Sequence, residues 1–482
     1  MKLEREEKSL NLEILDRNFL DTVDSDKEQP DTTAAMGHML LKRKFVILGD
    51  QADAPLGMYR GDGVGIYTTN ERDIERAIMN EMPRYSIRQV KEVYQKLTIW
   101  TGANYQAEPT HDKNLIPVAN GIYNVAEKKL MPFSSKYLFT TKVATPYDPD
   151  AKEPTVGPDD WKPSDWLMDL ANHDQQVYRL FWQVIHASLN SSYCYRQAIF
   201  LVGPGNDGKG TLEKLLISLV GPKNTASLKI DEFSDRFAIG SIDGKALVIG
   251  DDVQANSYLS NSSKFNSVVT GDPVTVERKN QQGYTTNLTP TIVQSTNEMP
   301  KFKNTTDGTY RRLVIVPFKH QFSKEEDNWN IKDDYVNRPE VLKWVLKNAL
   351  ENYAVSRFDM PDVSQQAIQE LKEESDPLVN FKHEVFDEQH PTRIPTKALY
   401  HYYVEYQKMN NQRNTMGPAR FTREFLKLLS SKYEKRKARI TSTDWAFNGL
   451  FPNDMTEEEL VRYVGTSSVQ CFIEKKTPRK KV

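Results

Sequence analysis

A glycine-rich loop with a single lysine lies in the middle of the chain, between an apolar run and a helical pattern. Residues 198–202 are all apolar, as in a buried parallel strand, and residues 212–219 repeat apolar side chains at helical spacing. The loop between them has the spacing Gly-x-x-x-x-Gly-Lys. Because the amides at the start of a helix and a lysine ammonium both attract phosphates, this stretch predicts a nucleotide-binding loop. The residues expected to contact ATP are Gly203, Gly205, Asn206, Gly208, Lys209, Gly210 and Thr211.

The residue after the lysine departs from the common pattern. A Ser or Thr hydroxyl usually ligates Mg²⁺ from that position, but here the position is Gly210. The next hydroxyl is that of Thr211, one residue further along the helix. We therefore expect Thr211 to hold Mg²⁺, either directly or through a water molecule.

Two acids end the next apolar segment. Residues 245–250 predict a strand, and Asp251 and Asp252 follow it. In nucleotide hydrolysis one such acid holds Mg²⁺, while a second polarises the attacking water. We assign Asp251 to the metal and Asp252 to the base, and the reverse assignment is also open.

Polar side chains that could assist hydrolysis border two later strands. Residues 291–296 predict a strand that ends at Asn297, whose amide either orients water beside the γ-phosphate or caps the turn before Pro300. Arg311 and Arg312 precede another apolar strand. An arginine there could stabilise transition-state charge on the nucleotide of a neighbouring subunit. A pair of surface salt bridges is the simpler alternative.

A β-hairpin is predicted at residues 274–288, where alternating side chains are interrupted by Asn-Gln-Gln-Gly. Its first strand ends in Arg278 and Lys279, which Asn280 follows. The tip either presents cations to a DNA backbone or is simply solvated.

A second basic region lies near the C-terminus. A predicted helix at residues 421–433 runs into a basic run, and residues 446–450 and 469–473 could form the strands of a wing. This order indicates a winged-helix-like domain whose basic face meets DNA phosphates, with a solvated helical lid as the alternative. The residues expected to contact DNA here are Lys435, Arg436, Lys437 and Arg439.

Length and composition bound the remaining possibilities. A chain of 482 residues predicts two to four domains, and 64 basic against 66 acidic residues require any nucleic-acid surface to be local. Two cysteines, Cys194 and Cys471, argue against a disulfide scaffold or a zinc ribbon and fit a reducing cytoplasm. Because no run of 18 apolar residues occurs, we expect no membrane span.

The pattern divides the chain into five parts. They are a polar arm (1–36), a small α+β domain (37–160), the nucleotide-binding core (161–325), a helical linker or lid (326–376) and the C-terminal domain (377–482). In the first two folded parts, strands are expected at 45–48, 63–68, 115–125 and 136–143, and helices at 73–79, 87–100 and 165–190.

Together these motifs resemble the superfamily 3 helicases, and most of all their D5-like branch, found in phages, plasmids and phage-related chromosomal islands. Three stretches carry the resemblance: the Gly-Asn-Asp-Gly-Lys-Gly-Thr loop at 205–211, Gly-Asp-Pro-Val-Thr-Val-Glu-Arg-Lys at 271–279, and Ser-Thr-Asn-Glu-Met-Pro at 295–300. Residues 120–151 also resemble the domain that precedes the ATPase in this branch.

The resemblance implies a multidomain α/β protein with an α+β N-terminal domain, an AAA+ P-loop ATPase core on a parallel sheet and a winged-helix-like C-terminal domain. It also implies a hexameric ring of identical subunits that binds ATP and Mg²⁺ between them and moves along single-stranded DNA. By this resemblance Lys209 is the phosphate-loop lysine, Asn297 the sensor, Arg312 or Arg311 the arginine finger, and Lys279 the hairpin lysine. Viral members have a histidine where this chain has Asn280.

The expected function is therefore an ATP-dependent DNA helicase and replication initiator of a mobile element, which unwinds duplex DNA at an origin and works with host replication proteins. No primase motif is visible. One alternative is an ATP-switched initiator that melts the origin and recruits a host helicase. A second is a P-loop ATPase or kinase that does not act on DNA.

Overall fold

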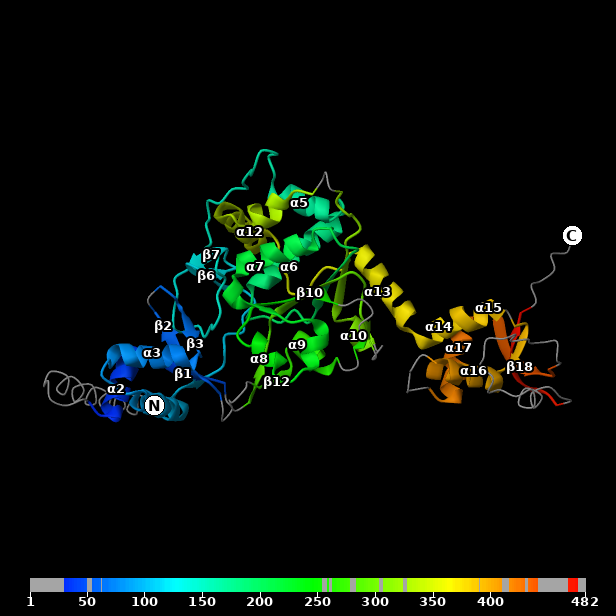
Figure 1. Cartoon of the computed structure of the whole chain (residues 1–482), viewed down its shortest axis with the longest axis horizontal. Coiled ribbons are helices and arrows are strands. Elements are labelled where there is room, and N and C mark those ends of the chain that lie inside the picture. Colours follow the sequence, from blue (N-terminus) through cyan, green and yellow to red (C-terminus); the bar gives the residue numbers. More distant parts are fainter. Residues whose placement is uncertain are drawn as a thin grey trace. The chain divides into compact units, whose positions relative to one another are not determined.

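The computed structural model describes residues 30–49, 54–61, 63–253, 258–259, 262–277, 283–302, 307–323, 327–389, 391–409, 416–429, 432–440 and 467–475 (Figure 1). The chain divides into two compact units, Met1–Ile368 and Gln369–Val482, and each is described by itself. The finer division into five parts stays a prediction. Among the described helices, none has the length and apolar character that a membrane crossing needs.

The described part of the first unit begins, at residue 30, with three helices against a four-stranded sheet of order β3-β2-β1-β4. Apolar side chains from the helices and from β1 and β2 form one buried cluster, which includes Met39, Ile47, Ile74 and Leu97. The bounds are α2 (Thr32–Lys42), β1 (Phe45–Leu48), β2 (Leu56–Arg60), β3 (Ile66–Thr68), α3 (Glu71–Glu81), α4 (Ile87–Asn104) and β4 (Gln106–Ala107). The strand and helices predicted at 45–48, 73–79 and 87–100 are confirmed, and β3 is shorter than the strand predicted at 63–68.

The polar arm predicted at residues 1–36 is wrong for its last part. The Asp31 carboxylate accepts hydrogen bonds from the amides of Thr33 and Ala34 and so caps α2. Ala35 and Met39 of this helix are fully buried. The cap and the apolar face fold residues 30–36 onto the sheet, while residues 1–29 lie outside the described part.

A small antiparallel sheet follows, made of β5 (Leu115–Val118), β6 (Gly121–Asn124) and β7 (Lys129–Met131). It confirms the strands predicted at 115–125, but the strand predicted at 136–143 is wrong. Phe139 and Val143 are buried in two different apolar clusters. The segment therefore runs between the clusters without pairing along one strand.

The centre of the first unit is a parallel sheet of order β16-β8-β14-β10-β9, flanked by helices (Figure 1). Ile199 and Leu201 of β8 pack in the same cluster as α6, α7 and α12. Phe200, pointing the other way, meets Phe265 of α9. This alternation buries both faces, as the wholly apolar strands predicted. The strands are β8 (Ala198–Val202), β9 (Thr225–Ser227), β10 (Leu247–Val253), β14 (Thr291–Thr296) and β16 (Leu313–Pro317).

The helix predicted at 165–190 is divided in two. Asn172 and His173 have φ of 50° and 58°, and the Asp174 carboxylate caps the second helix. The helices of this unit are α5 (Pro163–Leu170), α6 (Gln175–Leu189), α7 (Lys209–Val220), η1 (Pro222–Asn224), η2 (Ile230–Ser234), α8 (Ala238–Ile242), α9 (Ser263–Thr270), α10 (Asp307–Tyr310), α11 (Trp329–Asp333), η3 (Tyr335–Asn337) and α12 (Pro339–Asn352). Helix α13 (Asp362–Ser375) follows them.

The predicted β-hairpin is confirmed. Strands β12 (Pro273–Val276) and β13 (Tyr284–Asn287) pair antiparallel, with Val276 opposite Tyr284 next to the turn. Another short pair, β11 (Tyr258–Leu259) and β15 (Lys301–Phe302), is parallel.

The second unit packs helices on a three-stranded antiparallel sheet of order β17-β19-β18. Its core is largely aromatic, with Phe381, Tyr403, Phe421, Phe425 and Phe472 fully buried. The elements are α14 (Pro377–Phe381), η4 (Lys382–Phe386), α15 (Asp387–Gln389), β17 (Arg393–Pro395), α16 (Thr396–Met409), α17 (Pro418–Leu429), β18 (Tyr433–Ala438) and β19 (Val469–Glu474).

The basic helix predicted at 421–433 ends early, at Leu429. Residues 433–438 instead pair along their whole length with β19, from Tyr433 opposite Glu474 to Ala438 opposite Val469. Pairing with a distant segment therefore overrides the helical preference of the Lys- and Arg-rich run. The strand predicted at 469–473 is confirmed, and the one predicted at 446–450 lies outside the described residues; that they form a wing stays a prediction.

Candidate nucleotide site

Three strands of the parallel sheet end at the same level. Val202 at the end of β8 pairs with Thr296 at the end of β14, and Thr296 pairs with Val253 at the end of β10. Because the strands are parallel, the glycine-rich loop, Asn297 and the acid pair share one edge. The register thus brings together residues that are up to 94 positions apart in the sequence, from 203 to 297.

The glycine-rich loop surrounds one of its own side chains, the Asp207 carboxylate. The Lys209 ammonium is buried and donates to the Gly203 carbonyl oxygen at 2.9 Å and to the Asp207 carboxylate at 2.5 Å. The amides of Gly205 and Lys209 also donate to that carboxylate, at 3.4 and 3.3 Å. The loop is therefore already shaped to hold a negatively charged group, and the sequence interpretation missed the role of Asp207.

Two glycines of this loop cannot carry a side chain. A Cβ at Gly203 would lie 2.3 Å from an Asp207 oxygen, and one at Gly208 would lie 2.4 Å from Leu170. Gly208 also has φ of 86°, in the left-handed region. Asn206 is exposed, and its side-chain amide donates to the Phe322 carbonyl oxygen at 2.7 Å; its contact with ATP stays a prediction.

The acid pair lies on a β-bulge. The register of β10 against β14 shifts between Gly250 and Val253, and Asp252 has φ of 52°. Both acids are exposed at the sheet edge. Ser295 of β14 donates to the Asp251 carboxylate at 3.1 Å and accepts from the Asp252 amide at 3.4 Å. The bulge turns two consecutive carboxylates towards the edge, and a bulge beside a functional site is a common device for aiming a side chain.

A third acid, which the sequence interpretation missed, lies close to the pair. Glu213 of α7 is 3% exposed, and Ser295 lies beside its carboxyl group. Burial, and then the nearby charge of Asp251, raise the pKa of Glu213 to about 7. The signal in the sequence is its position four residues after Lys209, which places both on one face of the helix.

The two residues after Lys209 are placed less favourably for a metal. A Cβ at Gly210 would lie 3.2 Å from the Lys332 ammonium. Thr211 is half-buried, and its amide donates to the Gly208 carbonyl oxygen. On a helix, a residue two positions after Lys209 points about 200° around the axis from it. The role of Thr211 as a Mg²⁺ ligand stays a prediction.

The remaining predicted catalytic residues divide between the two edges of the sheet. Asn297 is exposed at the end of β14, beside the loop. Arg311 and Arg312 precede β16, and the Arg312 carbonyl oxygen accepts from the Ala198 amide at the start of β8. The arginine pair is therefore at the opposite edge from the loop in the same chain.

The edge of the sheet at which Arg311 and Arg312 lie, here called the arginine edge, has a positively charged cavity. A cavity of about 570 Å³ there is lined by Arg196, Arg311, Arg312 and Arg357, and none of these is ion-paired within the described part of the chain. The Arg312 guanidinium donates to the Gly308 carbonyl oxygen. Burial and then the charge of Arg311 lower the pKa of Arg312.

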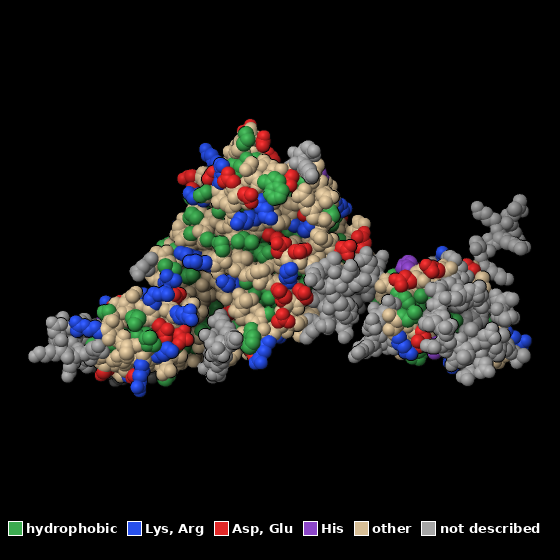
Figure 2. Space-filling model, in the orientation of Figure 1, with side chains coloured by type: hydrophobic (Ala, Val, Ile, Leu, Met, Phe, Trp, Pro, Cys, Tyr) green, Lys and Arg blue, Asp and Glu red, His purple; other side chains and the backbone are tan. Residues whose placement is uncertain are grey.

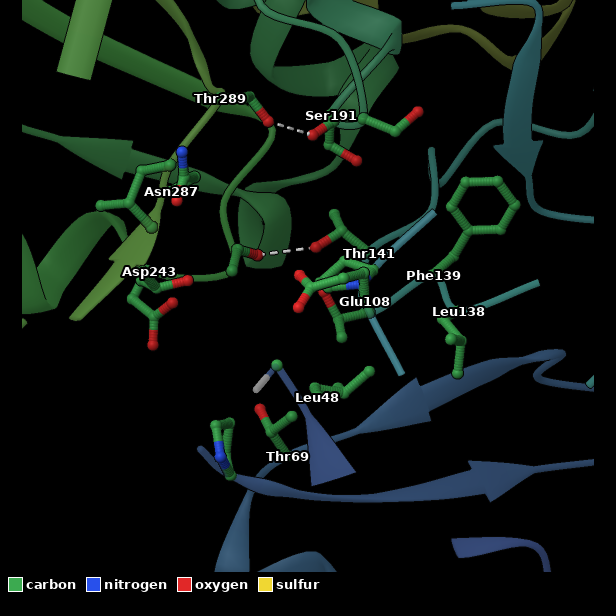
Figure 3. Close-up of a pocket in the computed structure, with 18 of the residues that line it drawn as sticks. Leu48, Thr69, Glu108, Leu138, Phe139, Thr141, Ser191, Asp243, Asn287 and Thr289 are labelled. Carbon is green, nitrogen blue, oxygen red and sulfur yellow. Dashed lines mark hydrogen bonds between the residues drawn. The ribbon is translucent and has the colours of Figure 1, made fainter. Parts of the chain in front are cut away.

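The predicted DNA contacts of the hairpin, Arg278, Lys279 and Asn280, lie outside the described residues. Its second strand is anchored, because Tyr284 hydrogen-bonds the Asp243 carboxylate. Figure 3 shows the hollow of about 210 Å³ beside this strand, where Asp243 and Asn287 face Leu48 and Thr69 of the N-terminal part. Residues that line the hollow form two hydrogen bonds of 2.7 Å. The Thr141 hydroxyl donates to the Gly244 carbonyl oxygen, and the Thr289 hydroxyl donates to the Ser191 carbonyl oxygen.

The C-terminal basic residues are exposed. Lys435, Arg436 and Lys437 lie on β18 and Arg439 follows it, with Arg436 paired to Glu434 at 3.2 Å. On the visible face of the first unit, acidic and basic side chains are interspersed (Figure 2). This pattern agrees with the nearly neutral composition.

Three family models match separate parts of the chain. "D5 N terminal like" matches residues 52–166, "Family of unknown function (DUF5906)" matches residues 201–312, and "Poxvirus D5 protein-like" matches residues 373–464. The model over the loop and the acids is thus the one whose family has no known function.

Solved structures of the NrS-1 C-terminal region without ligand are also similar. One, in its A form, is 12% identical, covers 93% of this chain and 100% of that chain, and has a TM-score of 0.47. Another is 12% identical, covers 86% of this chain and 97% of that chain, and has a TM-score of 0.48.

Proposed function

The chain belongs to the D5-like family of replication proteins, and from this premise we propose that it is an ATP-dependent DNA helicase that works as a hexameric ring and initiates replication of a mobile element. In this proposal the central sheet is an AAA+ P-loop core, and the C-terminal unit is a winged-helix-like domain that binds DNA.

The single observation that supports it most is the shared edge of the parallel sheet. Lys209 follows the loop after β8, Asp251 lies near the end of β10, and Asn297 directly follows β14. The ends of these three strands are in register there. These residue types are the ones that phosphate binding, metal binding and water positioning require. A glycine-rich turn without a ligand would not need the acids and the amide beside it.

The residues present fit ATP and Mg²⁺. The loop amides and Lys209 surround a carboxylate, so they form a cradle for an anion. Here Lys209 and the amides would hold the phosphates, and Asp251, with Thr211, would hold Mg²⁺. The bound metal neutralises phosphate charge. Asp252 is then the base that takes a proton from water, and Asn297 orients that water.

The arginines support a ring. Because Arg311 and Arg312 lie at the edge opposite the loop, they are poorly placed for the nucleotide of their own chain. In a closed ring the same edge faces the nucleotide of the next subunit, where an arginine stabilises developing charge. The cavity is lined by four arginines and one acid, Asp272, so its net charge is positive, as such an anion requires.

DNA would be bound at two places. The hairpin of β12 and β13, with Lys279 between its strands in the sequence, would contact single-stranded DNA in the ring. The exposed cations of β18 would bind duplex phosphates at an origin, which gives affinity but no base readout.

Unwinding of forked DNA tests the proposal directly. The full chain would be supplied with ATP and Mg²⁺ and with forks of both polarities, in parallel with Lys209→Ala. We expect wild type to unwind one fork polarity, and we expect the variant to bind DNA without unwinding either.

The other outcomes have distinct meanings. ATP hydrolysis without unwinding of either fork would overturn the helicase activity and favour the alternative, an ATP-switched initiator that recruits a host helicase. In that case Lys279→Ala would leave origin melting intact. Hydrolysis with no DNA binding at low salt would instead indicate a P-loop enzyme with another substrate.

A further inference from the structure

Burial of the Glu213 carboxyl group lowers the stability of the folded chain. It is 3% exposed, and its Oε1 atom has no hydrogen-bond partner within the described residues. A buried carboxyl oxygen without a partner is unfavourable, and the repulsion from Asp251 adds to this. A leucine or alanine would suit an apolar helix face better, so the acid needs a reason other than packing.

The surroundings of Glu213 point to a cation. Lys209 is four residues earlier on α7, and therefore on the same face of the helix. The Ser295 hydroxyl donates to Asp251 and lies close enough to Glu213 to lower its pKa, so the helix and the bulge of β10 meet at this residue. Two acids beside the phosphate cradle form a pair that a divalent ion would neutralise.

The missing hydroxyl at Gly210 gives the second, independent observation. A Ser or Thr at that position would normally supply the helix-side ligand of Mg²⁺. Gly210 has no side chain, and the Lys332 ammonium lies 3.2 Å from where its Cβ would be. The next residue on this face of the helix with an oxygen ligand is Glu213.

We propose that Glu213 is a helix-side carboxylate of the magnesium site and takes the place of the hydroxyl that is absent at position 210. The unpartnered Oε1 atom is the oxygen that binds the ion or one of its waters. This inference rests on the proposed nucleotide site, because the ion is the one that accompanies ATP.

The test measures binding, with no need for hydrolysis. The full chain is titrated with a non-hydrolysable ATP analogue, once with Mg²⁺ and once with EDTA, and Mn²⁺ binding to the analogue complex is measured by electron paramagnetic resonance. For Glu213→Gln we expect the gain in analogue affinity from Mg²⁺ to fall roughly tenfold or more, as for other groups that support a metal site. Affinity in EDTA should stay as in wild type.

Three further variants make the result specific. Glu213→Asp keeps the charge and should retain part of the Mg²⁺ effect. Gly210→Ser in the Glu213→Gln background restores a hydroxyl, and only the mobile end of Lys332 must move, so it should recover part of the loss. Glu340→Gln changes an exposed acid on α12 and should leave Mn²⁺ binding unchanged.

The result also separates this inference from the proposed function. If wild type binds neither the analogue nor Mn²⁺, the nucleotide site itself is wrong. If wild type and Glu213→Gln bind Mn²⁺ equally well in the analogue complex, only the role of Glu213 is overturned. Loss of binding by Glu213→Gln in EDTA as well as in Mg²⁺ would also overturn it, because the acid would then shape the loop.

Discussion

Lys209 and Asp207 form a buried ion pair inside the glycine-rich loop, with the ammonium 2.5 Å from the carboxylate. Asp207 also accepts from the amides of Gly205 and Lys209, the groups that a phosphate would use. The loop thus satisfies its own donors, and in the proposed function a nucleotide would have to displace the carboxylate to reach them.

We predict that Asp207→Asn raises the affinity for ATP. The amide keeps the shape of the side chain but loses its negative charge, so the phosphates compete with a weaker partner for Lys209. A charged hydrogen bond contributes about 1.5–3 kcal/mol, which corresponds to roughly a tenfold to hundredfold lower Kd. Calorimetric titration with an ATP analogue measures this change in Kd.

The control for this variant is Asp231→Asn, which removes an exposed acid elsewhere in the same unit. It should leave the Kd unchanged. If Asp207→Asn weakened ATP binding, the Asp207 carboxylate would help to bind ATP and would not compete with the phosphates for Lys209.

A mixing experiment tests the position of the arginine edge. Arg312→Ala should bind ATP as wild type does but hydrolyse it at least about a thousandfold more slowly, as for an arginine supplied by a neighbour. Lys209→Ala should fail to bind ATP. Mixed, the two inactive variants should recover ATPase activity, because some interfaces then join an intact loop to an intact arginine.

Two results would contradict this arrangement. Mixtures that stay inactive over all ratios would place Arg312 in the site of its own chain. A purely structural role would appear as a lower melting temperature of Arg312→Ala, so both variants are checked by thermal unfolding. Arg311→Ala, in the same assay, decides which of the two arginines acts.

The central sheet was predictable because the apolar sequence of its strands shows that both of their faces are buried. Segments such as 198–202 and 313–317 are apolar on both faces, and such strands require helices on each side. The acid pair and Asn297 could be placed at one edge for the same reason. In contrast, Glu213 lies within an apolar helix pattern, and only the fold brings it to Asp251 and Ser295.

The prediction was weakest where distant segments decide local structure. The basic run at 435–437 has a helical preference in isolation, but pairing with residues 469–474 makes it a strand. The segment 136–143 is rich in aromatic and β-branched residues, as strands are, yet its apolar residues enter separate clusters. In both cases the residues that decide the structure are distant in the sequence, so the local pattern alone could not distinguish strand from helix or loop.

The exposed cations of β18 should bind DNA through phosphates. Replacing Lys435, Arg436 and Lys437 together by Ala should weaken binding to any duplex sequence by a similar factor. Each lost contact should lower the slope of log Kd against log salt by about 1. Fluorescence anisotropy of two unrelated duplexes at several salt concentrations gives both quantities.

The matched control replaces two exposed lysines by Ala, Lys128 in the turn before β7 and Lys129 at the start of β7. This pair should leave the salt slope as in wild type. Equal slopes for wild type and the β18 variant would mean that these cations are a solvated face. Loss of binding to one duplex only would instead indicate base readout.

The pKa of Glu213 predicts a pH dependence of stability. Its value of about 7 in the fold is above the ordinary 4.5, so the folded state binds the proton more tightly than the unfolded state does. The stabilising effect is complete below about pH 4.5 and is lost as the pH rises to 7. The loss amounts to about 3 kcal/mol of unfolding free energy above that pH.

Glu213→Gln stays neutral and should therefore unfold at higher urea concentration than wild type at pH 8, in EDTA, with little difference at pH 5. His186 acts with the opposite sign, because burial lowers its pKa to about 4 and its stabilising effect is lost as the pH falls below 6.5. Both proteins share His186, so its effect cancels in their difference. A constant difference between pH 5 and pH 8 would show that Glu213 is not the titrating group.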